Sequence, residues 1–142
     1  MIRPATSDDM VKLAYLIGEL GYPTTEEEMK HRMEKINSSP EYKTLVKEKD
    51  GKLVGMIGMI LGYHYENNDN YVRIVALVVD SDYRNQGIGE QLMDEAEKWA
   101  KQNEATKLVL NSGNRRERHT AHRFYIRRGF EAKATGFYKR LI

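Results

Sequence analysis

The chain has 142 residues, with 23 Lys and Arg against 21 Asp and Glu, and a formal charge of +2. It has no cysteine, which excludes a disulfide framework, a thiolate nucleophile and a cysteine-ligated zinc. Hydrophobic residues make up 40% of the chain and charged residues 31%, a balance typical of a single soluble globular domain. No apolar stretch is long enough to span a bilayer, and the first residues lack a signal-peptide pattern, so we expect a cytoplasmic protein.

The charge is unevenly distributed. The segment from Arg115 to Ile142 carries nine basic and two acidic residues, a net charge of +7, which leaves −5 for the rest of the chain. Such a segment is typical either of a site for an anionic partner or of a solvated, arginine-rich helix face. Composition alone does not decide between these two.

The first residues predict a short strand followed by two helices. Residues 2–5 form the strand, and Thr6 or Ser7 caps a helix that ends at Gly21-Tyr22-Pro23. The stretch from Thr25 to Glu28 is a capping box, in which the Thr25 hydroxyl and the Glu28 carboxylate satisfy each other's backbone amides. It starts the second helix.

The middle of the chain predicts a hairpin and a buried strand. Asp50-Gly51 is a strong two-residue turn signal between strands at 42–49 and 52–63. After a polar loop, residues 71–80 form a further strand. Its run from Ile74 to Val79 is continuously apolar, which predicts a strand covered on both faces.

The last third alternates helix and strand. Apolar residues from Ile88 recur at helical spacing to about Asn103, and residues 107–111 form another buried strand. A helix from Arg118 to Arg128 ends at Gly129, and the chain from Phe130 toward Tyr138 returns as a strand. We therefore expect a mixed sheet with helices on both faces, an α/β or α+β architecture in three layers, without an internal domain boundary.

The segment Arg84-Asn85-Gln86-Gly87-Ile88-Gly89 lies between the apolar strand and the helix after it, where a phosphate could bind. Glycines at 87 and 89 remove Cβ atoms that would block the approach of a ligand to the backbone, and they permit positive φ. The first-turn amides of the helix have no internal partners and point outward with the positive end of its dipole.

Two other phosphate-binding motifs do not fit this segment. A dinucleotide fingerprint fails because Leu92 stands at its third glycine position, and a Walker A loop fails because Glu90-Gln91 replaces its Lys-Ser/Thr pair. A glycine-rich helix start without a ligand remains the structural alternative.

Two motifs resemble the GNAT N-acetyltransferase superfamily. Arg84-x-x-Gly87-x-Gly89 resembles its acetyl-CoA signature, R/Q-x-x-G-x-G/A, and the stretch from Ala121 to Phe130 resembles its closing A-x-x-F/L-Y-x-x-x-G-F helix. The order of elements also matches over residues 1–142. The resemblance implies one GNAT acetyltransferase domain, with a mostly antiparallel sheet that splays in the middle.

The resemblance also implies a binding site for acetyl-CoA as co-substrate. The backbones of Leu77 and Val79 would pair with the pantetheine, and an N–H near Val79 would polarise the thioester carbonyl. The pyrophosphate and the rest of the cofactor would contact Arg84, Asn85, Gln86, Gly87, Ile88, Gly89, Asn111 and Arg118.

Tyr125 is the implied catalytic residue. A thiolate leaving group must gain a proton, and a phenol with the ordinary pKa of about 10 still carries one at neutral pH. The structural alternative is that Tyr125 packs in the core with Ala121 and Phe124.

The sequence does not identify the general base. Many relatives place a Glu on the strand that matches residues 71–80, but here Arg73 and Ala76 take the likely inward positions. A water chain, Glu66 or His64, or an amine that arrives neutral could take this role. His119-x-x-His122 has a spacing that could ligate a metal, but no carboxylate is near in sequence to complete a site, and we expect none.

The acceptor is not decided by sequence. The closing segment 118–130 and the stretch from Leu53 to Gly58 resemble aminoalkylphosphonate N-acetyltransferases, and Arg73 would suit a phosphonate or carboxylate. An acidic pocket would instead suit a polyamine or an aminoglycoside, and it could be built from Glu26, Glu27, Glu28, Glu66 and Asp69.

The expected function is transfer of an acetyl group to a primary amine of a small molecule. Transfer should be direct, within one ternary complex, because the chain has no cysteine to carry the acetyl group. The alternatives are a catalytically weak acetyl-CoA-binding sensor, acetylation of a protein amine and, ranked lower, a nucleic-acid binder. The expected partners are a small-molecule amine and a second copy in a homodimer, with neither nucleic acid nor a membrane.

Overall fold

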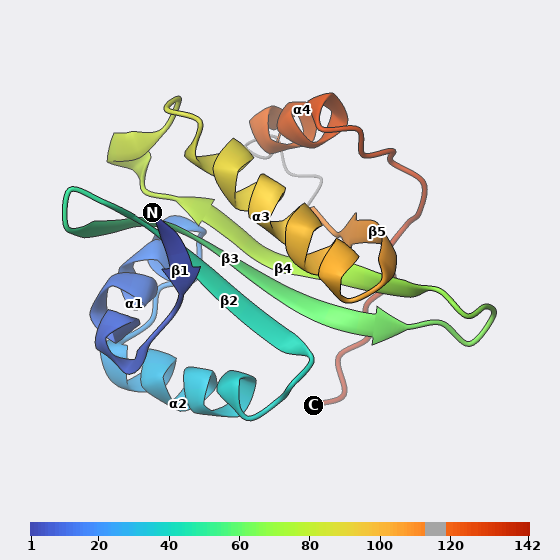
Figure 1. The fold of residues 1–142 in the computed structure, drawn as a ribbon. Coiled ribbons are helices and arrows are strands. Elements are labelled where there is room, and N and C mark those ends of the chain that lie inside the picture. The colour runs from blue at the N-terminus through green and yellow to red at the C-terminus, as the bar shows by residue number, and fades with distance from the viewer. Residues whose placement is uncertain (113–118) are drawn as a thin grey trace. The chain divides into compact units, whose positions relative to one another are not determined.

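A five-stranded sheet organises the chain, and its strand order follows the sequence, β1-β2-β3-β4-β5 (Figure 1). The structure is a computed structural model that describes residues 1–112 and 119–142. The strands are β1 (Ile2–Pro4), β2 (Tyr42–Lys49), β3 (Lys52–Tyr63), β4 (Asn70–Val79) and β5 (Ala105–Leu110). The first four pair antiparallel. A helix connects β4 to β5, as is typical of parallel neighbours, so the sheet is mixed.

Within the described residues the α-helices are α1 (Met10–Glu19), α2 (Glu26–Asn37), α3 (Ile88–Gln102) and α4 (His119–Arg127), with short 3-10 turns η1 (Ser7–Asp9) and η2 (Ser81–Tyr83). The chain forms two compact units, an N-terminal unit (Met1–Val109) and a C-terminal unit (Leu110–Ile142). No helix in the described ranges is long and apolar enough to cross a membrane.

Helices cover both faces of the sheet in the N-terminal unit. A Cβ placed on Gly55 would lie 3.1 Å from Ile88 and 3.2 Å from Leu92, so this face of β3 packs on α3. The next residue, Met56, points to the opposite face and joins the core formed with α1 and α2. The predicted three-layer α+β architecture is therefore confirmed.

Two predictions that rest on residues close together in sequence, the capping box and the hairpin turn, are confirmed. The capping box of Thr25 and Glu28 starts α2, and Thr6 forms a second one with Asp9 at η1. Asp50 and Gly51 have φ angles of 53° and 76°, which form a tight turn between β2 and β3.

A β-bulge interrupts the pairing of β3 with β4. Gly58 pairs with Ala76 and Met59 with Ile74, so Val75 is an extra residue on β4. The bulge leaves Val75 48% exposed. The prediction that the apolar run of β4 is covered on both faces is therefore wrong at this residue.

The C-terminal unit differs more from the sequence-based prediction than the N-terminal unit does. No strand forms after Phe130, and Phe137 and Tyr138 are 92% and 83% exposed. Strand structure requires a partner for its backbone groups, and the alternation of this segment alone does not supply one. The predicted burial of the strand near residue 107 is also wrong, because Thr106 and Lys107 are exposed.

Candidate functional site

The loop between β4 and α3 forms an open backbone cradle. Gly87 is the N-cap of α3 with a φ of 79°, and Asn85 also has a positive φ, 62°. The first helical hydrogen bond runs from the Gln91 amide to the Gly87 carbonyl, at 3.0 Å. The amides before Gln91 therefore precede the helical ladder, and no side chain caps them. Such a helix start favours an anion.

The cradle is exposed but firmly anchored. Residues 84–87 are exposed, whereas Ile88 is only 2% exposed and packs beside Gly55. A Cβ added to Gly87 would meet no atom within 4 Å, so the space over the backbone is open. The structure thus brings the predicted residues Arg84 to Gly89 together at the end of the strand that carries Leu77 and Val79, both half-buried.

Asp80 holds the turn that leads into the cradle. Its side chain accepts a hydrogen bond from the Asp82 amide at 3.0 Å and pairs with the Lys12 ammonium at 3.2 Å. Burial raises the pKa of Asp80, but the Asp82 amide and Lys12 outweigh burial, so the pKa lies below its usual value. Asp80 is therefore an anion at neutral pH and ties α1 to this turn.

A cation from the β2–β3 hairpin reaches the cradle. The Lys49 ammonium donates a hydrogen bond to the Gln86 side-chain oxygen. An ammonium has three donors, so two remain for another acceptor. Sequence reasoning missed Lys49, because 37 residues separate the partners and only the folded hairpin brings them together.

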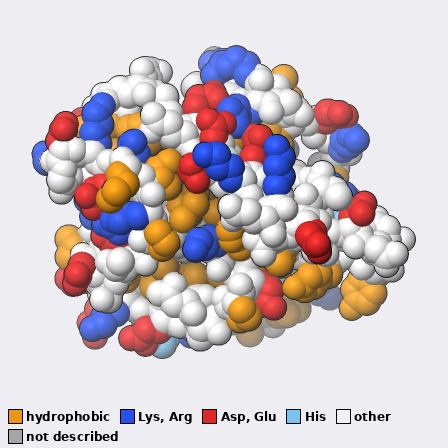
Figure 2. Space-filling view, in the orientation of Figure 1, with side chains coloured by type: hydrophobic (Ala, Val, Ile, Leu, Met, Phe, Trp, Pro, Cys, Tyr) orange, Lys and Arg blue, Asp and Glu red, His pale blue; other side chains and the backbone are white. Residues whose placement is uncertain are grey.

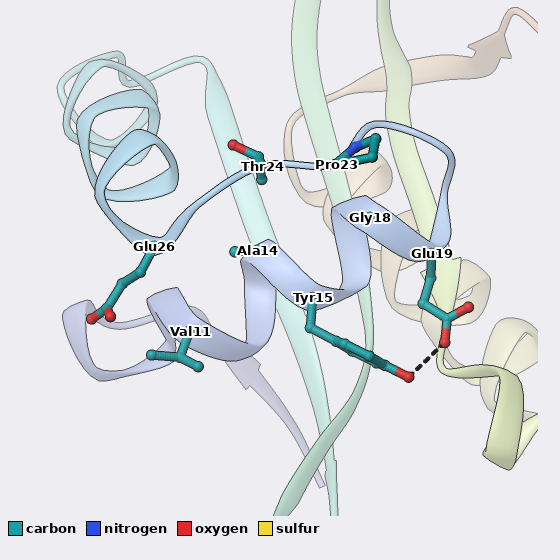
Figure 3. A pocket seen from close by; sticks show the side chains of 8 residues that line it. All are labelled: Val11, Ala14, Tyr15, Gly18, Glu19, Pro23, Thr24 and Glu26. Carbon is teal, nitrogen blue, oxygen red and sulfur yellow. Dashed lines mark hydrogen bonds between the residues drawn. The ribbon is translucent and has the colours of Figure 1, made fainter.

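A cavity of about 530 Å³ lies between α1 and the segment that leads into α2 (Figure 3). It is lined by Val11, Ala14, Tyr15, Gly18, Glu19, Pro23, Thr24 and Glu26. The Tyr15 hydroxyl donates to Glu19 at 2.7 Å, and the hydroxyl of Ser81, just after β4, donates to the same oxygen at 2.9 Å. The bond to Glu19 raises the pKa of Tyr15 to about 12.

Tyr15 and Glu19 were also missed, although they stand at the i, i+4 spacing of helix neighbours. The bond from Tyr15, followed by the one from Ser81, lowers the pKa of Glu19. Of the five acidic residues considered for a pocket, only Glu26 lines this cavity.

The remaining predicted residues lie in the C-terminal unit or outside the described ranges. Tyr125 on α4 makes edge-to-face contacts with Phe124 and Phe130, with ring centroids 5.7 and 5.9 Å apart. Asn111 donates a hydrogen bond to the Tyr138 hydroxyl at 3.2 Å. Arg118 is outside the residues that the structure describes.

The candidates for the base lie near the start of β4. His64 Nδ1 is 3.4 Å from a Glu66 carboxylate oxygen, and its ring centroid is 4.9 Å from that of Tyr71. Arg73 lies over the same Tyr71 ring, with its Cζ 6.0 Å from the ring centroid, and Ala76 packs against the core of α1 and α2. The run from Asn70 to Val79 has no carboxylate.

A protein family and a curated relative that match this chain are both acetyltransferases. The profile of the Acetyltransferase (GNAT) family matches residues 10–130. An aminoalkylphosphonate N-acetyltransferase from Salmonella typhimurium is 36% identical over 93 residues, which cover 66% of this chain and 59% of that protein. This chain thus matches less than two thirds of that relative's length.

Solved acetyltransferase structures superpose on nearly the whole length of this chain. A GNAT family acetyltransferase from Staphylococcus aureus superposes with a TM-score of 0.85 at 33% identity, covering 99% of this chain and 98% of the other. An aminoglycoside 6'-N-acetyltransferase from Acinetobacter haemolyticus shares the fold, with a TM-score of 0.82 at 19% identity over 100% and 99% of the two chains. The family profile covers most of the sequence, and it includes both the cradle and α4. The chain therefore belongs to the acetyltransferase (GNAT) family.

Proposed function

We propose that this chain is an N-acetyltransferase that uses acetyl-CoA and transfers the acetyl group directly to a primary amine of a small molecule. We further propose that residues 1–142 act as a single domain. The observation that carries the proposal is the open, glycine-capped start of α3 at the end of β4.

The residues of the cradle fit the pyrophosphate of coenzyme A. Open space over Gly87 admits a phosphate, and the amides that precede Gln91 face the ligand with the positive end of the α3 dipole. Lys49, which bonds to Gln86, and Arg84, which belongs to the loop itself, add positive charge at the cradle. The other proposed contacts are Leu77, Val79, Asn85, Gln86, Ile88, Gly89, Asn111 and Arg118.

Acetyl-CoA would supply an activated acetyl thioester. As the amine nitrogen forms its bond to the acetyl carbon and the carbon–sulfur bond breaks, the amine loses one proton and the sulfur gains one. Tyr125 Oη is proposed to donate the proton that the sulfur gains, and the proton that the amine loses passes to solvent, from which Tyr125 is reprotonated. A backbone N–H near Val79 is proposed to donate to the carbonyl oxygen, where negative charge develops.

The acceptor is proposed to enter the cavity beside α1. Ser81, two residues after the end of β4, bonds to Glu19 in the cavity wall, so the cavity adjoins the end of the strand assigned to the cofactor. Two matched proteins are named for aminoalkylphosphonates and aminoglycosides, and both classes are small molecules with primary amines. They support a small-molecule acceptor without fixing its identity.

Binding of acetyl-CoA to a Gly87→Glu variant tests the cradle. A carboxylate and its side chain at this position would occupy the open space and repel the phosphates, so we expect binding to be lost in calorimetry. Gln102→Glu, the same charge change at the exposed far end of α3, is the control and should bind normally. Normal affinity of the Gly87 variant would contradict the cradle assignment.

An acetyl-CoA sensor is the second candidate, favoured by the lack of a carboxylate on β4. Thiol release measured with a panel of small amines separates the two functions. An enzyme turns over with at least one amine, and the product gains the mass of an acetyl group. A sensor binds acetyl-CoA without turnover.

A further inference from the structure

The cavity beside α1 has a mostly apolar floor. Val11, Ala14 and Gly18 fall at helical spacing on one side of α1, and all three line the cavity. Val11 is 63% exposed, whereas Ala14 is 7% exposed and also belongs to the core with Met10, Leu13 and Leu16. Pro23 lines the same cavity and lies near Gly18 in Figure 3. Such walls suit the hydrocarbon part of a ligand.

Carboxylates stand at the two ends of this floor. In Figure 3, Glu19 lies at the end of α1 beside Tyr15, and Glu26 lies at the opposite end, near Val11. Glu19 is fixed by Tyr15 and Ser81. Glu26 is exposed and makes no hydrogen bond or ion pair with any residue in the described ranges.

The nearby positive charge does not cancel these carboxylates. The Lys12 ammonium is 4.3 Å from the centroid of the Tyr15 ring, but it is paired with the buried Asp80 carboxylate. Glu19 and Glu26 thus leave the cavity with a negative charge at each end. The helix rises about 1.5 Å per residue, so the floor from Val11 to Glu19 is about 12 Å long.

We propose that this cavity selects a linear aliphatic diamine or polyamine as the acetyl acceptor. The nitrogen that is acetylated lies at the Glu19 end, beside the residues that follow β4, and the second, cationic nitrogen pairs with Glu26. The methylene chain lies along Val11, Ala14 and Gly18. This inference rests on the proposed function and adds the class of its substrate. The same charges disfavour a phosphonate at the Glu26 end.

Equilibrium binding to the CoA-loaded protein tests the inference. The probes are the diamines from diaminopropane to diaminodecane, the monoamines of equal length, and aminoethylphosphonate. We expect the best diamine to bind about three- to fivefold more tightly than its monoamine, since one added ion pair at an exposed carboxylate contributes about that much. Equal binding of diamine and monoamine, or tighter binding of aminoethylphosphonate, would overturn the inference.

Matched variants locate the second nitrogen. Glu26→Gln should abolish the preference for diamines and leave monoamine affinity unchanged, whereas Glu19→Gln should weaken both. Glu27→Gln is the control, because Glu27 is the exposed neighbour of Glu26 but does not line the cavity. A loss in Glu27→Gln as large as in Glu26→Gln contradicts the assignment. Glu26 makes no contact needed for folding, so its variant remains informative even if Glu19→Gln folds poorly.

The failure of this inference is distinguishable from failure of the proposed function. Thiol release from acetyl-CoA with other amines, but no preference for diamines, overturns the substrate class and leaves the acetyltransferase function intact. Diamine binding without thiol release from acetyl-CoA supports the cavity assignment and contradicts the proposed acetyltransferase activity.

Discussion

Tyr125 packs against two other aromatic rings, and its hydroxyl group is the part of the side chain to which we assign a proposed role. Its ring packs edge-on against Phe124 and Phe130, and backbone bonds from Gly129 and Phe130 close α4 just after it. A phenylalanine would preserve this packing, so the Tyr125→Phe substitution removes only the hydroxyl group.

We predict that Tyr125→Phe lowers turnover about ten- to a hundredfold at nearly unchanged acetyl-CoA affinity, an effect up to the lower limit of the roughly hundred- to ten-thousandfold that a general acid typically contributes. Steady-state thiol release and calorimetric binding measure the two quantities. Tyr22→Phe is the control, because Tyr22 is 64% exposed in the turn after α1. Full turnover of the Tyr125 variant would exclude the acid role.

Asp9 is the centre of a buried ion network at the start of α1. Arg3 donates to both of its carboxylate oxygens at 2.8 and 2.9 Å, and the Thr6 amide donates at 2.7 Å. The Arg3 guanidinium is the main cause that lowers the pKa of Asp9, against the opposing effect of burial. The folded state therefore favours the ionised carboxylate.

We predict that Asp9→Asn lowers the free energy of unfolding at pH 7 by about 2 kcal/mol, because it removes the charged partner of two Arg3 hydrogen bonds while Glu48 stays paired with Arg3. Since the folded pKa lies below the unfolded one, this stabilisation is complete above the unfolded pKa and is lost as pH falls through the folded one. The difference between variant and parent in urea unfolding should thus shrink as pH falls below about 4. Glu95→Gln, which breaks the exposed pair with Lys98, should change stability by less than about 0.5 kcal/mol.

At the scale of elements, Gly55 sets the distance between α3 and β3. A Cβ there would lie 3.1 to 3.3 Å from Ile88, Leu92 and the Val78 carbonyl, which is closer than ordinary contact. A Cβ on Gly58, in the same strand, would meet its neighbours at 3.7 Å or more. Ile88 is also the first residue of α3, so the packing at Gly55 fixes the position of the cradle.

We predict that Gly55→Ala costs about 1 kcal/mol of stability and weakens acetyl-CoA binding, because Ile88 must move. Gly58→Ala, which adds the same methyl group where there is room, should be neutral or slightly stabilising. Urea unfolding and calorimetry on the pair measure both effects. Equal behaviour of the two variants would contradict the packing argument.

Elements with local signals could be predicted from sequence, and those that depend on distant partners could not. The Asp50-Gly51 turn and the Thr25 capping box involve residues within a few positions of each other. The expected strand after Phe130 needs a neighbouring strand, and its alternating pattern does not show whether one is present.

The same distinction applies to the site. The cradle was predictable because glycines between a strand and a helix mark it directly. The Lys49 contact and the α1 cavity were not, because each joins elements whose packing no short motif encodes.

The charge of the whole molecule has two parts of opposite sign. The segment from Arg115 to Ile142 carries +7 and the remainder −5. On the face that Figure 2 shows, acidic and basic side chains are interspersed over α3, as is typical of the solvated side of a helix. The overall charge of +2 therefore says little about what a polyanion meets at the cradle.

We predict that acetyl-CoA affinity falls several-fold as salt rises from about 0.1 to 1 M, since the Debye length then shrinks from about 10 to 3 Å. Lys49→Met should weaken binding at low salt and flatten this dependence, because it removes one cation that reaches the cradle. Lys35→Met, at the far end of α2, should do neither. The acetyl thioester of pantetheine, which lacks the nucleotide phosphates, should bind with little dependence on salt. A dependence equal to that of acetyl-CoA would show that the salt acts on the protein rather than on its phosphate contacts.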